Sequence, residues 1–179
     1  LLQYADGASL YSKSAPTVIR KTVRLPETQD GEPICQSWRQ MVNIGYAHDG
    51  LIGSVQEQLR RAQKEIGFTY LRFHGIFDDD MHIYQENEDG SPWFNFAYAD
   101  LLFDFIQEIG LIPYVELGYM PSKLAKTQYT VFDNPAICIS MYNDSEKWQA
   151  LVQACLSHWI DKYGLANVRK WRFTVFSMN

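Results

Sequence analysis

Apolar residues recur along this chain in two patterns, one with the spacing of a helix and one typical of a buried strand. The helical intervals of three or four residues run over residues 51–66 and end at Gly67, which suits the position after a helix C-terminus. A short, aromatic-rich run, Phe68–Phe73, follows at once and predicts a strand buried on both faces. The strand turns polar at Arg72 and His74. We therefore expect a helix, a glycine turn and a buried strand with a polar end.

The same order of helix, glycine and strand occurs twice more. A helix predicted over residues 98–109 leads into a strand at Ile112–Leu117. A helix predicted over about 146–163 leads into a strand at Trp171–Phe176. A further candidate strand, Met41–Ala47, precedes the first helix. This repetition predicts parallel strands connected by helices.

The repeated units predict an α/β fold, an incomplete (β/α)8 barrel of the TIM type with about four βα units and a short N-terminal β segment. The barrel half is expected over residues 38–179, after a lead-in over residues 1–37 that includes an edge strand at Thr17–Leu25. A dinucleotide-binding sheet is not indicated, because no GxGxxG or GxxxxGK[ST] loop follows a strand. A half-barrel leaves strand edges and apolar surface exposed, so we expect a longer chain or self-association.

Composition narrows the choice of partners. The chain has 179 residues, is 46% apolar and 15% aromatic, and carries a net charge of −5. No basic stripe or run of eighteen apolar residues is present, so we expect neither nucleic-acid binding through this segment nor a membrane span. The three widely spaced cysteines indicate reduced thiols and a cytoplasmic location, and no metal or other cofactor is indicated. These cysteines are Cys35, Cys138 and Cys155.

Polar residues at strand ends are the candidate binding residues, because ligands of parallel α/β folds sit at the carboxyl ends of strands. His74 either hydrogen-bonds a ligand or is a core histidine satisfied by backbone, and its position favours the ligand. Glu116 has the same placement and either contacts a ligand or pairs with Arg72. The acidic run Asp78–Asp80 lacks the alternation of a calcium loop, which favours a solvated loop over a cation site.

The segment Arg72–Met81, RFHGIFDDDM, resembles a motif of glycoside hydrolase family 39, the β-xylosidase and α-iduronidase family. The resemblance is to the N-terminal half of the catalytic barrel and extends over residues 38–176. It implies hydrolysis of β-xylosides with retention, by one carboxylic acid that serves as acid/base and a second carboxylate that serves as nucleophile. The other segments that carry it are QEQLRRAQKEIG at 56–67, YVELGYMP at 114–121 and HWIDKYG at 158–164.

The family's acid/base is the Glu of an Asn-Glu-Pro triplet at the end of the fourth strand. The resemblance places Ser177 at the position of that Asn and Met178 at the position of that Glu. A thioether has no proton to donate, and loss of the acid alone typically removes ~10²–10⁴-fold of the rate. The nucleophile is expected on a later strand, beyond Asn179, so no catalytic residue is intact here. The candidate substrate-binding residues are His74, Glu116, Phe77, Trp93 and Tyr119.

Three functions stay open at this point. The leading one is a catalytically degenerate domain that binds a xylose-type sugar or oligosaccharide, because residues 38–47 also resemble the version fused to AraC-type transcriptional regulators. The alternative is a truncated fragment of an active retaining β-xylosidase that hydrolyses β-1,4-xylosides. A third is a structural half-barrel that dimerises and binds nothing. Phe77, Trp93 and Tyr119 suit stacking on a sugar, although core packing explains them as well.

Overall fold

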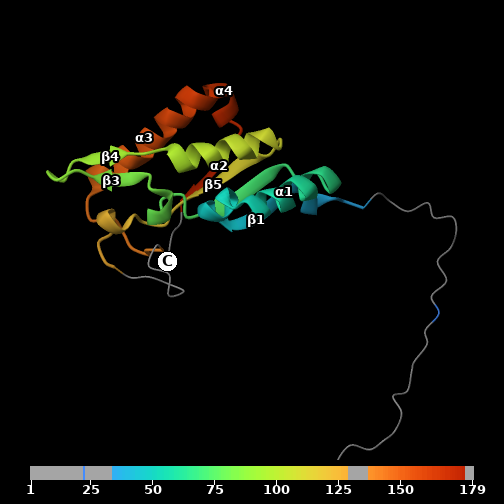
Figure 1. Ribbon diagram of the computed structural model, residues 1–179, viewed down its shortest axis with the longest axis horizontal. Helices are drawn as coiled ribbons and strands as arrows, with labels where there is room; N and C mark the ends of the chain where they lie inside the picture. The colour runs from blue at the N-terminus through green and yellow to red at the C-terminus, as the bar shows by residue number, and fades with distance from the viewer. Residues whose placement is uncertain (1–21, 23–33, 129–136, 176–179) are drawn as a thin grey trace, which may run out of the picture. The chain divides into compact units, whose positions relative to one another are not determined.

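The chain divides into two compact units, Leu1–Cys35 and Gln36–Asn179. The computed structural model describes residues 22, 34–128 and 137–175 (Figure 1). All helices and strands given below belong to the second unit. The edge strand predicted at Thr17–Leu25 lies outside the described residues, apart from Thr22, which has no regular structure.

The second unit alternates strands and helices in the order that the sequence predicts. Its main sheet has the order β1-β2-β5-β6, and every neighbouring pair is parallel. The incomplete α/β barrel is thereby confirmed. None of the described helices is both long and apolar enough to cross a membrane. The strands are β1 (Met41–Tyr46), β2 (Tyr70–His74), β5 (Ile112–Leu117) and β6 (Arg172–Val175), and the helices are α1 (Gly53–Glu65), α2 (Ala97–Glu108), α3 (Ser145–Tyr163) and α4 (Leu165–Val168). Short 3-10 helices lie at Ser37–Gln40, Ala47–Leu51, Asp79–Met81 and Ser122–Leu124.

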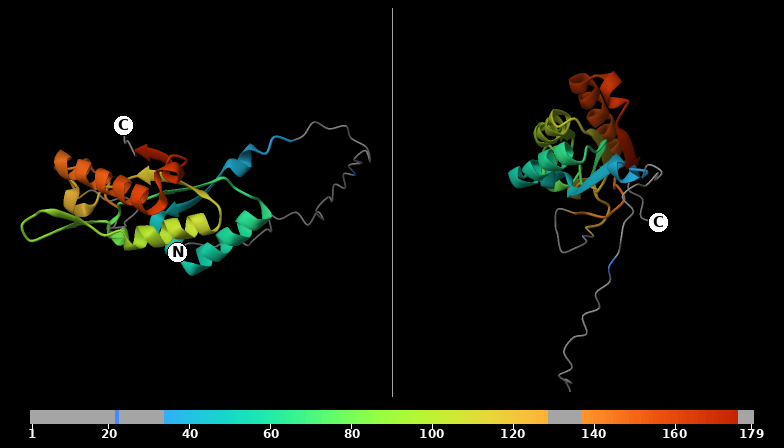
Figure 2. Two further views of the ribbon diagram at one scale, coloured as in Figure 1. Left: turned by 90° about the horizontal axis from the view of Figure 1, so that it is seen from above. Right: turned by 90° about the vertical axis from the view of Figure 1, so that its right-hand side faces the viewer.

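One face of the sheet is covered by helices. Because alternate residues of a strand point to opposite faces, Leu71 and Phe73 of β2 share one face with Val115 of β5, and all three are fully buried. The ring of Phe73 lies 5.8 Å from that of Phe103 on α2. Salt bridges join α1 to α2 and α2 to α3, and Figures 1 and 2 show these helices side by side. The core therefore lies between this face and the three helices.

The opposite face of the sheet is open and largely polar. Strand pairing places Asn43, Arg72, Tyr114 and Arg172 beside one another, one from each strand. In a closed (β/α) barrel, residues with this orientation line the interior. Together with Tyr70 and Glu116, which point to the same face, they form what we call the interior row. Of these residues only Glu116 is buried. The interior row consists of Asn43, Tyr70, Arg72, Tyr114, Glu116 and Arg172.

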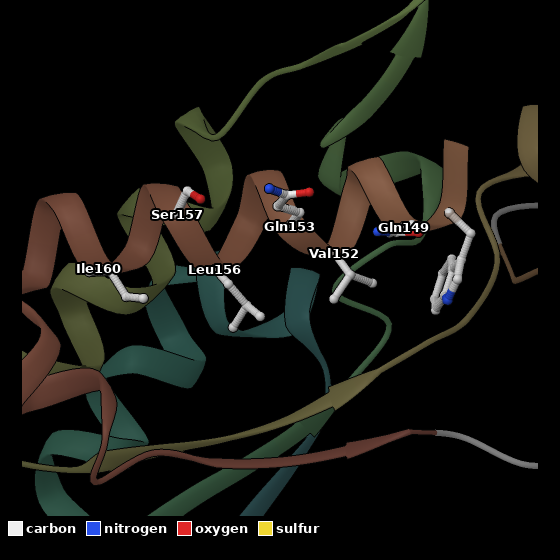
Figure 3. Close-up of a pocket in the computed structure, with 7 residues that line it drawn as sticks. Gln149, Val152, Gln153, Leu156, Ser157 and Ile160 are labelled. Atoms are coloured by element: carbon white, nitrogen blue, oxygen red, sulfur yellow. The ribbon is translucent and has the colours of Figure 1, made fainter. Parts of the chain in front are cut away.

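The sheet edge at β6 is also open. Phe173 and Val175 of this strand are 37% and 65% exposed. In Figure 3, apolar side chains of α3 point toward the strands that run below the helix, whereas Gln153 and Ser157 point away. A strand edge beside an apolar helix face is what a further βα unit would cover, as the half-barrel prediction requires. The apolar side chains that line this groove are Trp148, Val152, Leu156 and Ile160.

The segment between β2 and α2 differs from the loop that the sequence predicts. Here β3 (Tyr84–Glu86) and β4 (Pro92–Phe94) pair as an antiparallel hairpin. The connecting turn has Gly90 at φ +80°, and the N–H of Asn87 donates to the carbonyl of Ser91 at 2.9 Å. The Asp-Gly pair is a hairpin signal, but three-residue strands are too short to show alternation. The short helix α4 was missed for the same reason.

Candidate functional site

The carboxyl ends of β1, β2 and β5 bring aromatic and polar side chains together. Tyr46 ends β1, His74 ends β2, and Tyr119 follows β5. The His74 ring lies between the two tyrosine rings, with centroid distances of 4.3 Å to Tyr46 and 5.7 Å to Tyr119, both edge-on. Arg72 lies two residues before His74 on β2, and Glu116 lies near the end of the neighbouring β5, so both side chains point to the same face of the sheet as His74. We call these five residues the strand-end cluster.

Arg72 and Glu116 form an ion pair across β2 and β5. Nη2 of Arg72 donates to Oε2 of Glu116 at 2.5 Å. Glu116 is only 5% exposed, and a buried carboxylate requires a charged or hydrogen-bonding partner. Of the two alternatives for Glu116, the structure shows the pairing with Arg72, and a contact between Glu116 and a ligand stays a prediction.

His74 is half-buried, and its ring nitrogens are available for hydrogen bonds to a ligand. Within the described part of the chain, neither of its ring nitrogens forms a hydrogen bond. Burial lowers the pKa of His74, although the Glu116 carboxylate opposes this shift. The imidazole is therefore neutral at pH 7, with one nitrogen that donates and one that accepts. Such a ring can both donate to and accept from a hydroxyl group of a ligand.

The solvated loop predicted over Asp78–Asp80 is wrong for its first member. Asp78 is 2% exposed, because a turn in which its N–H donates to the carbonyl of Gly75 folds the residue back under the end of β2. Its Oδ1 accepts the backbone N–H of Tyr119 at 3.3 Å. Burial, followed by the nearby Asp80 carboxylate, raises the pKa of Asp78 to about 7. Among the described residues, no group of three or more His, Cys, Asp or Glu side chains is placed to hold a metal ion.

Two of the predicted stacking residues lie outside the strand-end cluster. Phe77 is 1% exposed and packs edge-on against Trp148 with a centroid distance of 5.6 Å. It belongs to the hydrophobic core, so neither of its ring faces is open to a sugar in this structure. Trp93 lies on β4 of the hairpin and is 43% exposed, opposite Gln85. Of the three aromatic candidates, only Tyr119 is brought to His74.

An apolar cavity of about 460 Å³ adjoins the strand-end cluster at Tyr119. The loop after β5 forms one wall, and the start of α3 and the end of β6 contribute others. The rings of Tyr142 and Trp148 stack in this wall with an interplanar angle of 16°. The cavity is lined mainly by Leu117, Tyr119, Met120, Cys138, Met141, Tyr142, Trp148 and Val175.

Comparison with known proteins identifies the family. The family described as glycosyl hydrolases family 39 matches residues 21–178 of the chain. The chain belongs to glycosyl hydrolase family 39. It is 35% identical over 160 residues to a β-xylosidase of Geobacillus stearothermophilus, covering 88% of this chain and 31% of the relative. It is 36% identical over 140 residues to a β-xylosidase of Caldicellulosiruptor saccharolyticus, and this match covers 78% of this chain and 28% of the relative.

A solved structure supports the same assignment for this family 39 domain. The crystal structure of the GH39 enzyme from Xanthomonas axonopodis pv. citri superposes with a TM-score of 0.74 and 28% sequence identity. The superposition covers 82% of this chain and 28% of the Xanthomonas chain. The chain thus spans less than a third of the curated relatives it matches. Met178, which the resemblance places at the acid/base position, and Ser177, at the position of the preceding Asn, lie outside the described residues.

The family 39 domain has one cluster member that the sequence did not reveal. Strict alternation from Asn43 would turn Tyr46 away from the face that carries His74. The register between β1 and β2 shifts between Asn43 and Tyr46, and this irregularity returns the Tyr46 side chain to the face of His74. The Tyr46 N–H donates to Oδ2 of Asp49 at 3.1 Å, outside the ladder. Gly45 was the available signal, because a glycine inside a strand often marks a bulge.

Proposed function

We propose that this family 39 domain binds a xylose-type sugar or oligosaccharide at the strand-end cluster without hydrolysing it. The observation that carries the proposal is the placement of His74 at the carboxyl end of β2, where neither ring nitrogen forms a hydrogen bond with the described residues. Burial lowers the pKa of His74, which favours the neutral imidazole. The rings of Tyr46 and Tyr119 flank it, and the buried Glu116 lies nearby. A few convergent polar groups framed by aromatic surface are typical of small-molecule sites, and sugar hydroxyls match both hydrogen-bonding states of His74.

The loss of catalysis rests on the sequence at the end of the fourth strand of the barrel. Met178 stands where the family resemblance implies the acid/base Glu, and its thioether cannot protonate a leaving group. A sensor gains from this change, because it must bind the sugar without consuming it. Residues 38–47, which resemble the version fused to AraC-type regulators, support a role as the sensing module of a transcriptional regulator. Such a role places the protein in the cytoplasm.

A second candidate is an active retaining β-xylosidase. It is favoured by two curated relatives named β-xylosidase at 35% and 36% identity. In this reading, the acid/base is supplied by a residue other than Met178. The two candidates share the sugar pocket and differ in turnover.

The deciding experiment uses the full-length protein. Xylose and xylobiose are titrated by calorimetry, and hydrolysis of a chromogenic β-xyloside is measured on the same preparation. Binding without turnover supports the proposal, turnover supports the β-xylosidase, and the absence of binding refutes a sugar site. His74→Ala should weaken binding about tenfold, the value of one well-placed hydrogen bond in a half-buried site. His82→Asn is the matched control, because His82 is exposed and Asn tolerates its φ of 54°.

A further inference from the structure

We propose that Asp78 is a positioning residue whose ionised carboxylate holds the backbone of Tyr119 in the strand-end cluster, so that sugar affinity depends on the charge of Asp78. The inference rests on the proposed function, since it concerns the same sugar site. It adds a residue that touches no sugar and acts through Tyr119. Three observations lead to it.

The first observation is the placement of the Asp78 carboxylate between two strand ends. One oxygen, Oδ1, accepts the Tyr119 N–H in the loop after β5. The other, Oδ2, lies so close to Gly75 that a Cβ atom at that residue would come within 2.3 Å of it. Gly75 has φ +71°, which suits glycine, and the absence of its side chain provides the space for the carboxylate. The carboxylate therefore bridges the end of β2 and the loop after β5.

The second observation is a parallel bond from the next residue. Oδ1 of Asp79 accepts the backbone N–H of Ser122 at 2.9 Å. Adjacent aspartates after β2 thus hold two N–H groups of one loop after β5. Asp79 is half-buried, whereas Asp78 is 2% exposed. The Asp78 bond, at 3.3 Å, is the longer of the two, but it is shielded from water and is made to Tyr119 itself, so it acts directly on the position of Tyr119.

The third observation is the electrostatic environment of Asp78, in which none of the described groups that shift its pKa is a cation. Burial is the main cause of its raised pKa of about 7, Asp80 and Asp79 add to it, and the Tyr119 N–H opposes it. The charge of Asp78 therefore changes near neutral pH. The titratable groups around it are Asp79 and Asp80 from its own loop, Tyr46 from the end of β1 and Tyr119 from the loop after β5. Asp49, in the 3-10 helix after β1, lies beside Tyr46.

A consequence for sugar binding follows from the strength of the bond. An ionised carboxylate makes a charge-assisted bond about twice as strong as that of the neutral acid. As the pH falls from 8 to 6, Tyr119 should be held less firmly against His74, and affinity for xylobiose should fall about fivefold. His74 is neutral over most of this range, because burial lowers its pKa.

The test combines two measurements on the full-length protein at pH 6, 7 and 8. The backbone amide resonance of Tyr119 is followed by ¹⁵N NMR, and xylobiose affinity is measured by calorimetry. In the wild type the amide resonance should titrate with a midpoint near 7. In Asp79→Asn, the matched control, the titration should persist with a lower midpoint, because the Asp79 carboxylate adds to the raised pKa of Asp78. In Asp78→Asn the titration should vanish, and affinity should stay at the low-pH value of the wild type at every pH. A pH-independent Tyr119 amide in the wild type, or an unchanged pH dependence of affinity in Asp78→Asn, overturns the proposal.

The two proposals can fail separately. If the wild type binds no xylobiose at any pH, the sugar site is refuted, and the Tyr119 amide still reports whether Asp78 holds the loop. If xylobiose binds with pH-independent affinity, the sugar site stands and the positioning role of Asp78 is refuted. The wild-type titration needs no variant, so a folding defect in Asp78→Asn leaves the test intact.

Discussion

The ion pair between Arg72 and Glu116 predicts an asymmetry between two substitutions. The Arg72 side chain is 34% exposed and that of Glu116 only 7%. Arg72→Met preserves much of the volume but leaves a buried carboxylate without its cation. Glu116→Gln preserves the shape and leaves a guanidinium that reaches water. Removing one partner of a buried pair costs about 3–5 kcal/mol, so we expect about 3 kcal/mol for Arg72→Met. Water reaches the remaining charge in Glu116→Gln, so we expect about 1 kcal/mol there.

Urea denaturation at pH 7, followed by tryptophan fluorescence, measures both values. The midpoints should shift with an unchanged slope, because neither substitution alters the surface exposed on unfolding. The double variant should be more stable than Arg72→Met alone, since it no longer buries an unpaired charge. An equal or larger loss in Glu116→Gln would refute the reasoning. It would mean that the carboxylate of Glu116 is the better solvated partner.

Three further predictions follow from local geometry. Gly75→Ala should destabilise the protein by about 2–3 kcal/mol, through φ +71° and the clash with Asp78, whereas Gly90→Ala, at φ +80° with open space around it, should cost about 1 kcal/mol in the same urea assay. Asp144→Ala should cost about 1 kcal/mol on the same measurement, because its Oδ1 accepts two N–H bonds at the start of α3. His74 should titrate in ¹H–¹³C NMR below about 6.5, because burial lowers its pKa. The unfolded chain then binds the His74 proton more tightly than the folded chain does. The His74 contribution to the free energy of unfolding is therefore present above about pH 6.5 and is lost as the pH falls below it. This pH dependence should disappear in His74→Gln.

The sequence predicted the parallel sheet well because its elements carry strong local signals. The strand Ile112–Leu117 was located to the residue, since glycines stand close to both of its ends. The helix that became α3 has a long apolar face, of which Leu151, Cys155 and Trp159 are buried. The β3–β4 hairpin escaped prediction because its strands have three residues each. Periodicity needs more residues than that to be visible.

The candidate site was predicted less completely, for physical reasons that differ between residues. His74 and Glu116 were found because a polar residue at the end of an apolar strand is conspicuous in the sequence. Tyr46 was missed because a register shift, which depends on pairing with β2, decides its face. Asp78 was misjudged because its burial depends on the turn with Gly75 and on the loop after β5. Both errors concern tertiary contacts, and the only local signal for either was the bulge-prone Gly45 beside Tyr46.

The unequal faces of the sheet have a consequence for folding during synthesis. Chains fold as the ribosome delivers them, N-terminal part first, and transiently exposed apolar surface is what leads to aggregation. Here the apolar faces of β2 and β5 are covered by helices close to them in sequence, so this core can form early. The interior row on the other face carries three charged side chains, two tyrosines and one asparagine, so it is much less apolar. Within the described residues, the β6 edge and the groove on α3 are apolar surfaces that stay exposed beside this core and favour aggregation until they are covered.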